Sequence, residues 1–513
     1  MAADCSNPYR MIKKFAASLF LATALCAAQQ PQQPRQVTPP AAQGKQAKPE
    51  THISQQDAQK LFASIDEVFQ FVSKDTGLPI KHPVAKKLAN RDEVQKYIES
   101  KMAEDEDTKR FERSAIVLKK FGLIPRDFEL RPFLIKMMRD QVAGFYDVKT
   151  KTAYLLDWIE PDLQKPVMAH ELTHALQDQN FDLDKWAKDK TRDDAEKRGE
   201  YDRAVELDEN STAQTAMVEG QGMITLVDYM LKDYGHTAAD SPEVVRMMSS
   251  QIDSDNSSEV LKSAPMLLRE SLVFPYRDGM KFVGAVLRAN GKDAAFSGMF
   301  SRPPKTSYEV LTPSAYLQSR PIPSLRLPDM KALLGDAYSE YDLGAMGEFD
   351  AELLLKQFGD DDDARTISRD WDGGSYFAAL RKGATPDKTS SIALMYVSRW
   401  KTPDAASAFA KTYAGSIATK YKKVAPAECS PCEDGERRWN TDEGYVEVAQ
   451  RGNKVIVLEG FEEPLAVKIK EAALSGSGQQ MSADMRDLSI RVVPQWVRAM
   501  IAPSMLRDFP PLH

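Results

Sequence analysis

The stretch His170-Glu171-Leu172-Thr173-His174 is an H-E-x-x-H sequence, with two histidines four residues apart and a glutamate beside the first. Side chains at positions i and i+4 share one face of an α-helix, so both histidines can bind a single metal ion. Glu171 is displaced around the helix and can hold a water molecule at the metal, which is the arrangement of zinc-dependent peptide hydrolysis. The stretch therefore predicts a metal-bearing helix.

Residues on either side of the stretch predict the limits of this helix and what precedes it. Pro166 suits the first helical turn, and Asn180 suits a C-terminal stop. Residues 141–147 and 152–156 predict two strands that form a hairpin just before the helix. An edge strand in that position would let an extended peptide add to the sheet through main-chain hydrogen bonds.

A catalytic zinc ion usually has three protein ligands, so a third ligand is expected. Glu219 is the first candidate because it lies on an apolar stripe, where a buried carboxylate costs several kcal/mol unless a cation lies beside it. Glu209 is the second candidate, and an ion pair with a basic residue such as Arg269 is the alternative for Glu219. Gly220 and Gly222 predict close packing with a neighbouring helix. The stripe consists of Ala216, Met223 and Leu226.

The N-terminus has the features of a secretory signal. A charged pair, Lys13 and Lys14, precedes an apolar segment over residues 15–25 that is too short for a stable membrane span. We expect translation to start at Met11 and residues 1–28 to be removed. A lipoprotein is disfavoured because Leu25, which is not small, precedes Cys26. The mature protein is then periplasmic or extracellular, with no stable membrane span.

Composition and cysteine usage narrow the class of protein. The net charge is −7, without a basic run or a basic stripe interleaved with aromatic residues, which argues against nucleic-acid binding. Cys429 and Cys432 are the two cysteines after the signal segment. In an exported protein this C-S-P-C sequence predicts a local disulfide. Zinc binding there would need further ligands, and a thioredoxin-like redox motif would precede a helix.

Hydrophobic patterning divides the chain and predicts an α+β fold class. Residues 29–50 predict a disordered linker, residues 51–345 a largely helical domain with a small N-terminal sheet, residues 346–475 a small α+β domain, and residues 476–513 a tail. The expected elements are helices over 53–72, 115–121, 202–231, 403–421 and 465–474, a helix starting near Arg91, strands over 84–88, 375–380, 392–400, 445–450 and 454–460, and a solvated linker over 359–363.

With these features the chain resembles the gluzincins, zinc peptidases in which H-E-x-x-H and a downstream glutamate hold the metal. Over residues 55–345 it is also similar to a group of secreted bacterial proteins. The resemblance implies a zincin-like metallopeptidase domain over residues 51–345. Tyr308 and Thr312 depart from that group's pattern, since a histidine is expected at Thr312. The matching segments are 144–147 (GFYD), 169–183 (AHELTHALQDQNFDL), 217–222 (MVEGQG), 274–279 (FPYRDG) and 302–313 (RPPKTSYEVLTP).

The expected function is that of an exported zinc-dependent endopeptidase acting on peptides or proteins. Zn²⁺ would be held by the two histidines and Glu219, and Glu171 would act as general base toward a metal-activated water. The first candidate for oxyanion stabilisation is Tyr276, followed by Tyr146 and His236. Asp178 would either support His174 or be exposed. Two alternatives stay open: a zinc-bound scaffold without catalysis, and a zinc hydrolase of a non-peptide bond.

Overall fold

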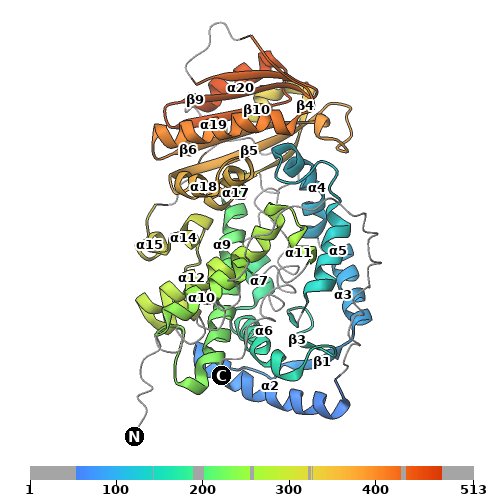
Figure 1. The fold of residues 1–513 in the computed structure, drawn as a ribbon, viewed down its shortest axis with the longest axis vertical. Coiled ribbons are helices and arrows are strands. Elements are labelled where there is room, and N and C mark those ends of the chain that lie inside the picture. Colours follow the sequence, from blue (N-terminus) through green and yellow to red (C-terminus); the bar gives the residue numbers. More distant parts are fainter. Residues whose placement is uncertain are drawn as a thin grey trace, which may run out of the picture. The chain divides into compact units, whose positions relative to one another are not determined.

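The computed structural model describes residues 53–104, 106–142, 144–188, 201–254, 259–321, 325, 327–428 and 435–475. The predicted signal peptide, linker, disulfide cysteines and C-terminal tail lie outside these residues. The described chain contains a small three-stranded sheet, a helical middle and a seven-stranded antiparallel sheet (Figure 1). The α+β class is therefore confirmed. Within the described part, no helix is long and apolar enough to cross a membrane.

The small sheet has the strand order β1-β3-β2, so β2 is an edge strand. β1 (Ala85–Ala89) runs parallel to β3 (Thr152–Leu156), and β2 (Phe145–Asp147) pairs antiparallel with β3. The predicted hairpin is confirmed. Its first strand is shorter than expected because residue 141 still belongs to helix α5 (Leu130–Gln141). Helix α2 (Gln55–Thr76) shares an apolar core with this sheet and the H-E-x-x-H helix.

The H-E-x-x-H sequence lies on helix α6 (Pro161–Phe181). The helix begins earlier than predicted because Pro161, rather than Pro166, takes the first-turn position that suits a fixed proline φ. It ends at Phe181, where Asp182 adopts a left-handed conformation with φ of 52°. The predicted stop, Asn180, lies in the last turn and donates from its side chain to the carbonyls of Leu176 and Pro79.

Helices α9 (Tyr201–Leu231) and α12 (Met266–Asp293) meet at two glycines. A Cβ at Gly220 would lie 2.3 Å from the Gly279 carbonyl oxygen, and a Cβ at Gly279 would lie 2.1 Å from the Ala216 carbonyl oxygen. The two backbones therefore approach more closely than any side chain permits, as predicted for Gly220. Other helices in this region are α3 (Arg91–Glu104), α4 (Glu106–Phe121), α7 (Leu183–Lys188), α10 (Pro242–Ser254), α11 (Glu259–Lys262), α14 (Ser307–Leu311) and α15 (Pro313–Leu317).

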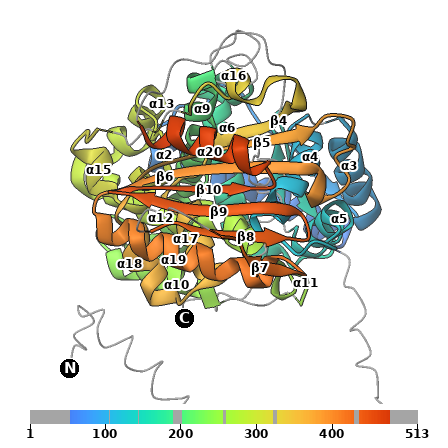
Figure 2. The same ribbon diagram turned by 90° about the horizontal axis from the view of Figure 1, so that it is seen from above.

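The large sheet has the order β4-β5-β6-β10-β9-β8-β7, and Figure 2 shows its strands side by side. The strands predicted in this part of the chain correspond to β5, β6, β9 and β10, and the last was predicted one residue too long, whereas β4, β7 and β8 were not predicted. β4 lies entirely before residue 346, the residue at which the small α+β domain was predicted to begin. The strands are β4 (Tyr338–Ala345), β5 (Trp371–Arg381), β6 (Ile392–Trp400), β7 (Val424–Pro426), β8 (Arg437–Thr441), β9 (Gly444–Arg451) and β10 (Lys454–Glu459).

Side chains alternate between the two faces of this sheet. Tyr376 and Tyr396 face the core that includes helix α19 (Pro403–Lys420), while Phe377 and Met395 face helix α20 (Glu463–Leu474). The acidic run over 359–363, predicted as a linker, instead starts a helix. Asp360 caps α18 (Asp361–Ser368) by accepting from the Asp362 backbone N–H. Helix α17 (Glu348–Phe358) precedes it.

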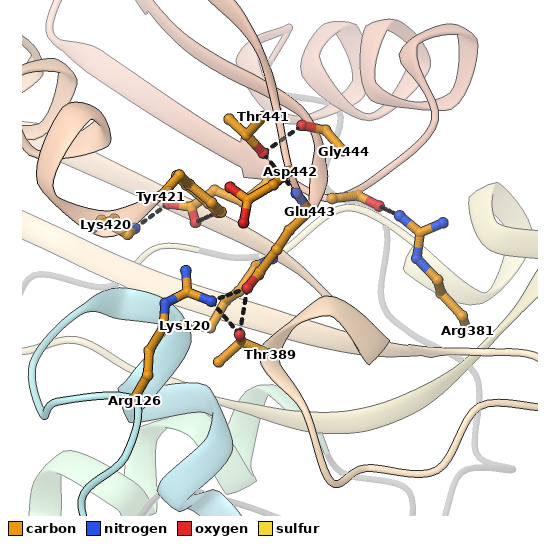
Figure 3. A network of polar contacts seen from close by, with 12 residues as sticks. Lys120, Arg126, Arg381, Thr389, Lys420, Tyr421, Thr441, Asp442, Glu443 and Gly444 are labelled. Atoms are coloured by element: carbon orange, nitrogen blue, oxygen red, sulfur yellow. Dashed lines mark hydrogen bonds and ion pairs between the residues drawn. The ribbon is translucent and has the colours of Figure 1, made fainter. Parts of the chain in front are cut away.

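A buried ionic network joins helix α4 to the large sheet (Figure 3). Lys120, at the end of α4, is fully buried and its Nζ lies 2.9 Å from Oε2 of Glu443 in the β8–β9 turn. Arg126 pairs with the other oxygen of Glu443, and Thr389 donates to that oxygen at 2.6 Å. Phe121 packs edge-on against Tyr376. Both charge and apolar contact thus join helix α4 and the loop that follows it to the large sheet.

Helices α2 and α9 also meet through two carboxyl groups, those of Asp75 and Asp228. Asp228 is buried and accepts a hydrogen bond from the Ala238 backbone N–H. Burial, followed by the nearby Asp75 carboxyl, raises the pKa of Asp228 to about 8. Burial also raises the pKa of Asp75 to about 6, although the charge of Lys292 opposes this. Both groups therefore hold protons in the folded state at pH values where they are ionised in the unfolded chain.

This pair makes stability depend on pH. Because both folded pKa values exceed the unfolded value, the stability present at low pH is lost as pH rises through about 6 and then about 8. Asp228→Asn keeps the acceptor for Ala238 and removes the charge. We expect it to stabilise the chain by at least about 1 kcal/mol at pH 8 and by less at pH 5, measured by urea unfolding. Equal effects at both pH values, or equal effects of exposed Asp233→Asn, would contradict this.

Candidate metal centre

His170, His174 and Glu219 bring three ligand atoms together at the contact of α6 with α9. The two histidine Nε2 atoms lie 3.0 Å apart, and Oε2 of Glu219 lies 3.1 Å from the Nε2 of His170 and 3.3 Å from that of His174. Ligands bound at about 2.0–2.2 Å in a tetrahedral site lie about 3.3–3.5 Å apart. The triad therefore has the composition and spacing to hold a metal ion.

The local sequence explains this meeting. The i, i+4 spacing puts both histidines on the α6 face that packs against α9, and the apolar stripe of α9 carries Glu219 into the same interior. The partners of Glu219 are the histidines. Arg269, the alternative partner, lies 3.7 Å from Glu270 instead.

Burial and charge act against each other in the triad. Burial would raise the pKa of Glu219, but the two histidines outweigh it and lower that pKa to about 2. Burial would lower the pKa of His174, but Glu219 and then Glu171 raise it to about 9. Burial dominates at His170 and lowers its pKa. The site therefore keeps Glu219 ionised and requires positive charge beside it, from a proton or from a metal ion.

Glu171 is fully buried beside the triad, and its two oxygens differ. Oε2 accepts a hydrogen bond of 2.8 Å from the backbone N–H of Tyr146 on the edge strand β2. Oε1 is buried and has no hydrogen-bond partner among the described residues. Burial is the largest cause that raises the pKa of Glu171 to about 8, which the charge of His174 opposes. One oxygen of this side chain is thus held in place and the other is open, and a cation bound beside it would oppose the effect of burial and favour the ionised form that accepts a proton.

Two glutamines that the sequence analysis missed form a series of hydrogen bonds that begins at His174. The Nδ1 atom of His174 lies 2.8 Å from Oε1 of Gln177, whose Nε2 donates to Oε1 of Gln221 at 2.7 Å. Gln221 in turn donates to the carbonyls of Ala295 and Phe296. The sequence signal was available, because Gln177 follows His174 by three residues and so shares its helix face.

Asp178 does not have either of its predicted roles. It is 4% exposed, which contradicts the expectation of a surface residue. Its carboxylate accepts from the Tyr146 hydroxyl at 2.9 Å and pairs with Lys151 at 2.7 Å, and Gln177 rather than Asp178 contacts His174. These contacts tie α6 to the β2–β3 hairpin. They also engage the Tyr146 hydroxyl, which was one candidate oxyanion donor.

The remaining predicted site residues lie in three different places. Tyr276 on α12 is buried, with its ring centroid 6.1 Å from that of His170, so the structure brings it to the triad. His236 is exposed and lies 3.5 Å from Asp240. Glu209 is buried away from the triad and accepts from the backbone N–H and the hydroxyl of Ser307.

Comparison with known proteins gives one match. Residues 337–469 match the model of a family described as a domain of unknown function (DUF8575). The match begins just before β4, ends within α20 and leaves the triad outside. No curated protein matches the chain, and no solved structure does.

Gly222 shapes the position of His170. A Cβ at Gly222 would lie 2.7 Å from both Nδ1 and Cε1 of the His170 ring, closer than real contacts allow. We expect Gly222→Ala to displace the ring and to weaken zinc binding by about 10-fold or more, as changes next to ligands do. The measurement is competition with a chromophoric chelator. Gly235→Ala, at an exposed glycine with φ of 72° and open space around it, controls for strain alone. Unchanged affinity in Gly222→Ala would show that the ring does not need this space.

Proposed function

We propose that this protein is an exported zinc-dependent endopeptidase of the gluzincin type. The observation that carries the proposal is the buried Glu171 carboxylate beside the triad, with Oε2 held by Tyr146 and Oε1 open. An unsatisfied buried acceptor costs about 1–3 kcal/mol, so its retention calls for a function. Accepting a proton is the function that suits an open carboxylate oxygen.

The triad, Glu171 and Tyr276 would each have a separate role in peptide hydrolysis. His170, His174 and Glu219 would hold zinc, since two imidazoles and a carboxylate form a common catalytic zinc set. Bound zinc would supply the positive charge that lowers the pKa of a water molecule and polarises a carbonyl group. Glu171 accepts the proton of the attacking water at Oε1 and delivers it to the leaving amine. Tyr276 donates a hydrogen bond to the developing oxyanion.

The edge strand supports a peptide as the substrate. β2 pairs with β3 on one side only, and its Tyr146 backbone N–H already holds the general base. An extended peptide that adds to this edge would run past Glu171. The signal features of residues 1–28 support a periplasmic or extracellular location.

Burial favours a second candidate, a zinc-bound scaffold without catalysis. His170, Glu171 and Glu219 are at most 1% exposed and His174 is 5% exposed. A peptide reaches them only when neighbouring elements separate, whereas a structural metal needs no access. The open oxygen of Glu171 weighs the other way, because a structural site does not need an ionisable group there.

The test compares zinc content and hydrolysis of a denatured protein by the chain lacking residues 1–28 and by its Glu171→Gln variant. We expect unchanged zinc and a loss of activity of about 10²–10⁴-fold, because Gln cannot accept the proton. Glu67→Gln, at an exposed glutamate of α2, should leave both unchanged. Full activity in Glu171→Gln would sink the peptidase proposal. Zinc without hydrolysis in either form would select the scaffold.

The third ligand has its own test. Glu219→Gln replaces the charged ligand by a neutral amide of the same size, and we expect zinc to fall well below one per chain in metal analysis after dialysis. The matched change at Glu209, which contacts Ser307 rather than the triad, should keep zinc. Stoichiometric zinc in Glu219→Gln would show that another residue completes the site.

A further inference from the structure

A chain of hydrogen bonds leads from His174 to a π-helical turn, Ala294–Gly298, at the end of α12. Its links are two glutamines, Gln177 on α6 and Gln221 on α9, and both are fully buried. The distances along the chain are 2.8 Å from His174 Nδ1 to Gln177 Oε1, 2.7 Å from Gln177 Nε2 to Gln221 Oε1, and 2.7 Å from Gln221 Nε2 to the Ala295 carbonyl. Single-turn π-helices recur at functional sites.

The far end of this series of hydrogen bonds determines how the two glutamine amides are oriented. The carbonyls of Ala295 and Phe296 can only accept hydrogen bonds, so Gln221 must present its NH₂ group to both of them. Its Oε1 then faces Gln177. The amide of Gln177 must present its own NH₂ group to that oxygen and to the Val218 carbonyl, which is 3.2 Å away. Gln177 Oε1 therefore faces His174.

Reversing either amide is costly. Reversal of Gln221 would place its oxygen against two carbonyl oxygens, and reversal of Gln177 would place its oxygen against Val218 and Gln221. Each buried hydrogen bond lost in this way costs about 1–3 kcal/mol. One orientation of both amides is therefore strongly preferred.

We propose that Gln177 and Gln221 are positioning residues that dictate which nitrogen of His174 carries a proton. An acceptor oxygen at Nδ1 requires Nδ1–H, so the lone pair of the neutral imidazole lies on Nε2. Nε2 is the atom that faces His170 and Glu219, at 3.0 Å and 3.3 Å. The π-helical turn thus orients two amides that leave the Nε2 lone pair of His174 available to a metal ion. Neither glutamine would itself bind the metal.

The inference rests on the metal site of the proposed function and not on hydrolysis. Its main test is Gln177→Met, which keeps length and removes both hydrogen-bonding groups. We expect zinc affinity, measured by chelator competition, to fall about 10–100-fold, as is typical when the partner of a metal-binding histidine is lost. Gln177→Glu keeps an acceptor for Nδ1–H and should bind zinc more tightly than Gln177→Met. Gln221→Met should give a smaller loss, because the Val218 carbonyl still orients Gln177.

Controls separate positioning from folding. Gln179→Met, on the same helix but bonded to the exposed backbone of Lys81 and His82, should keep normal affinity. The absorption spectrum of bound Co²⁺ should change in Gln177→Met, since the His174 ring turns, and a stability effect alone would not change it. Wild-type affinity in a folded Gln177→Met chain overturns this inference and leaves the proposed function standing. Zinc binding without peptide hydrolysis overturns only the proposed function, and no zinc binding by the unaltered chain overturns both.

Discussion

The buried charge of Glu219 is the constraint on which the middle of this structure depends. A carboxylate so far from water is stable only beside positive charge, and His170 and His174 lie within 3.3 Å of it. To bring them there, α6 must lie against α9, and Gly222 must leave room for the His170 ring. The contact of α9 with α12 at Gly220 then closes the interior on the other side. Close packing at Gly220 and Gly222 and the presence of two histidines in the triad therefore both serve to bury the charge of Glu219.

Among the residues of helix α9 whose side chains the structure describes (209–231), three acids are buried, and each has a different kind of partner. Glu209 accepts from Ser307, whose hydroxyl also accepts from the Phe349 backbone N–H at the start of α17. Glu219 faces the histidines, and Asp228 shares its environment with Asp75 of α2. Along this one helix, the three acids therefore contact Ser307, the two histidines of α6 and Asp75 of α2 in succession. Because the three acids lie on one helix, a displacement of α9 at Glu209 or Asp228 would also move Glu219.

Residues whose role follows from neighbours on the same helix could be predicted from the sequence, whereas residues whose partners are distant in the sequence could not. His170, Glu171 and His174 are defined by helical spacing, and Glu219 by an acid on an apolar stripe, so these were found from the sequence alone. Asp178 was misjudged because its partners, Tyr146 and Lys151, come from the hairpin, and helical spacing cannot foresee them. Gln177 and Gln221 were missed because an amide gains a role only when its distant partners are in place.

The strands that were not predicted lack an apolar alternation. β8 has no buried residue, and β7 is a three-residue edge strand that contains Pro426, a residue type found on edge strands. In β4 the first residue, Tyr338, is followed by the polar residues Ser339 and Glu340, and the pairing has a register shift between Glu340 and Asp342. Each of these strands is recognisable through its neighbours in the sheet and not through its own sequence. The central strands β5, β6, β9 and β10 are rich in buried apolar residues, and their positions were predicted.

The large sheet is coupled to helix α4 and the loop that follows it by opposite charges that are buried together. Lys120 is fully buried, and burial lowers its pKa to about 8, which the carboxylate of Glu459 opposes. Its ion-pair partner is Glu443, which Arg126 also contacts. Glu443 lies within the segment matched by the domain family, whereas Lys120 and Arg126 lie outside it. Separation of the two parts would leave Glu443 without either cation, so in this chain the stability of the sheet domain depends on α4 and the loop that follows it.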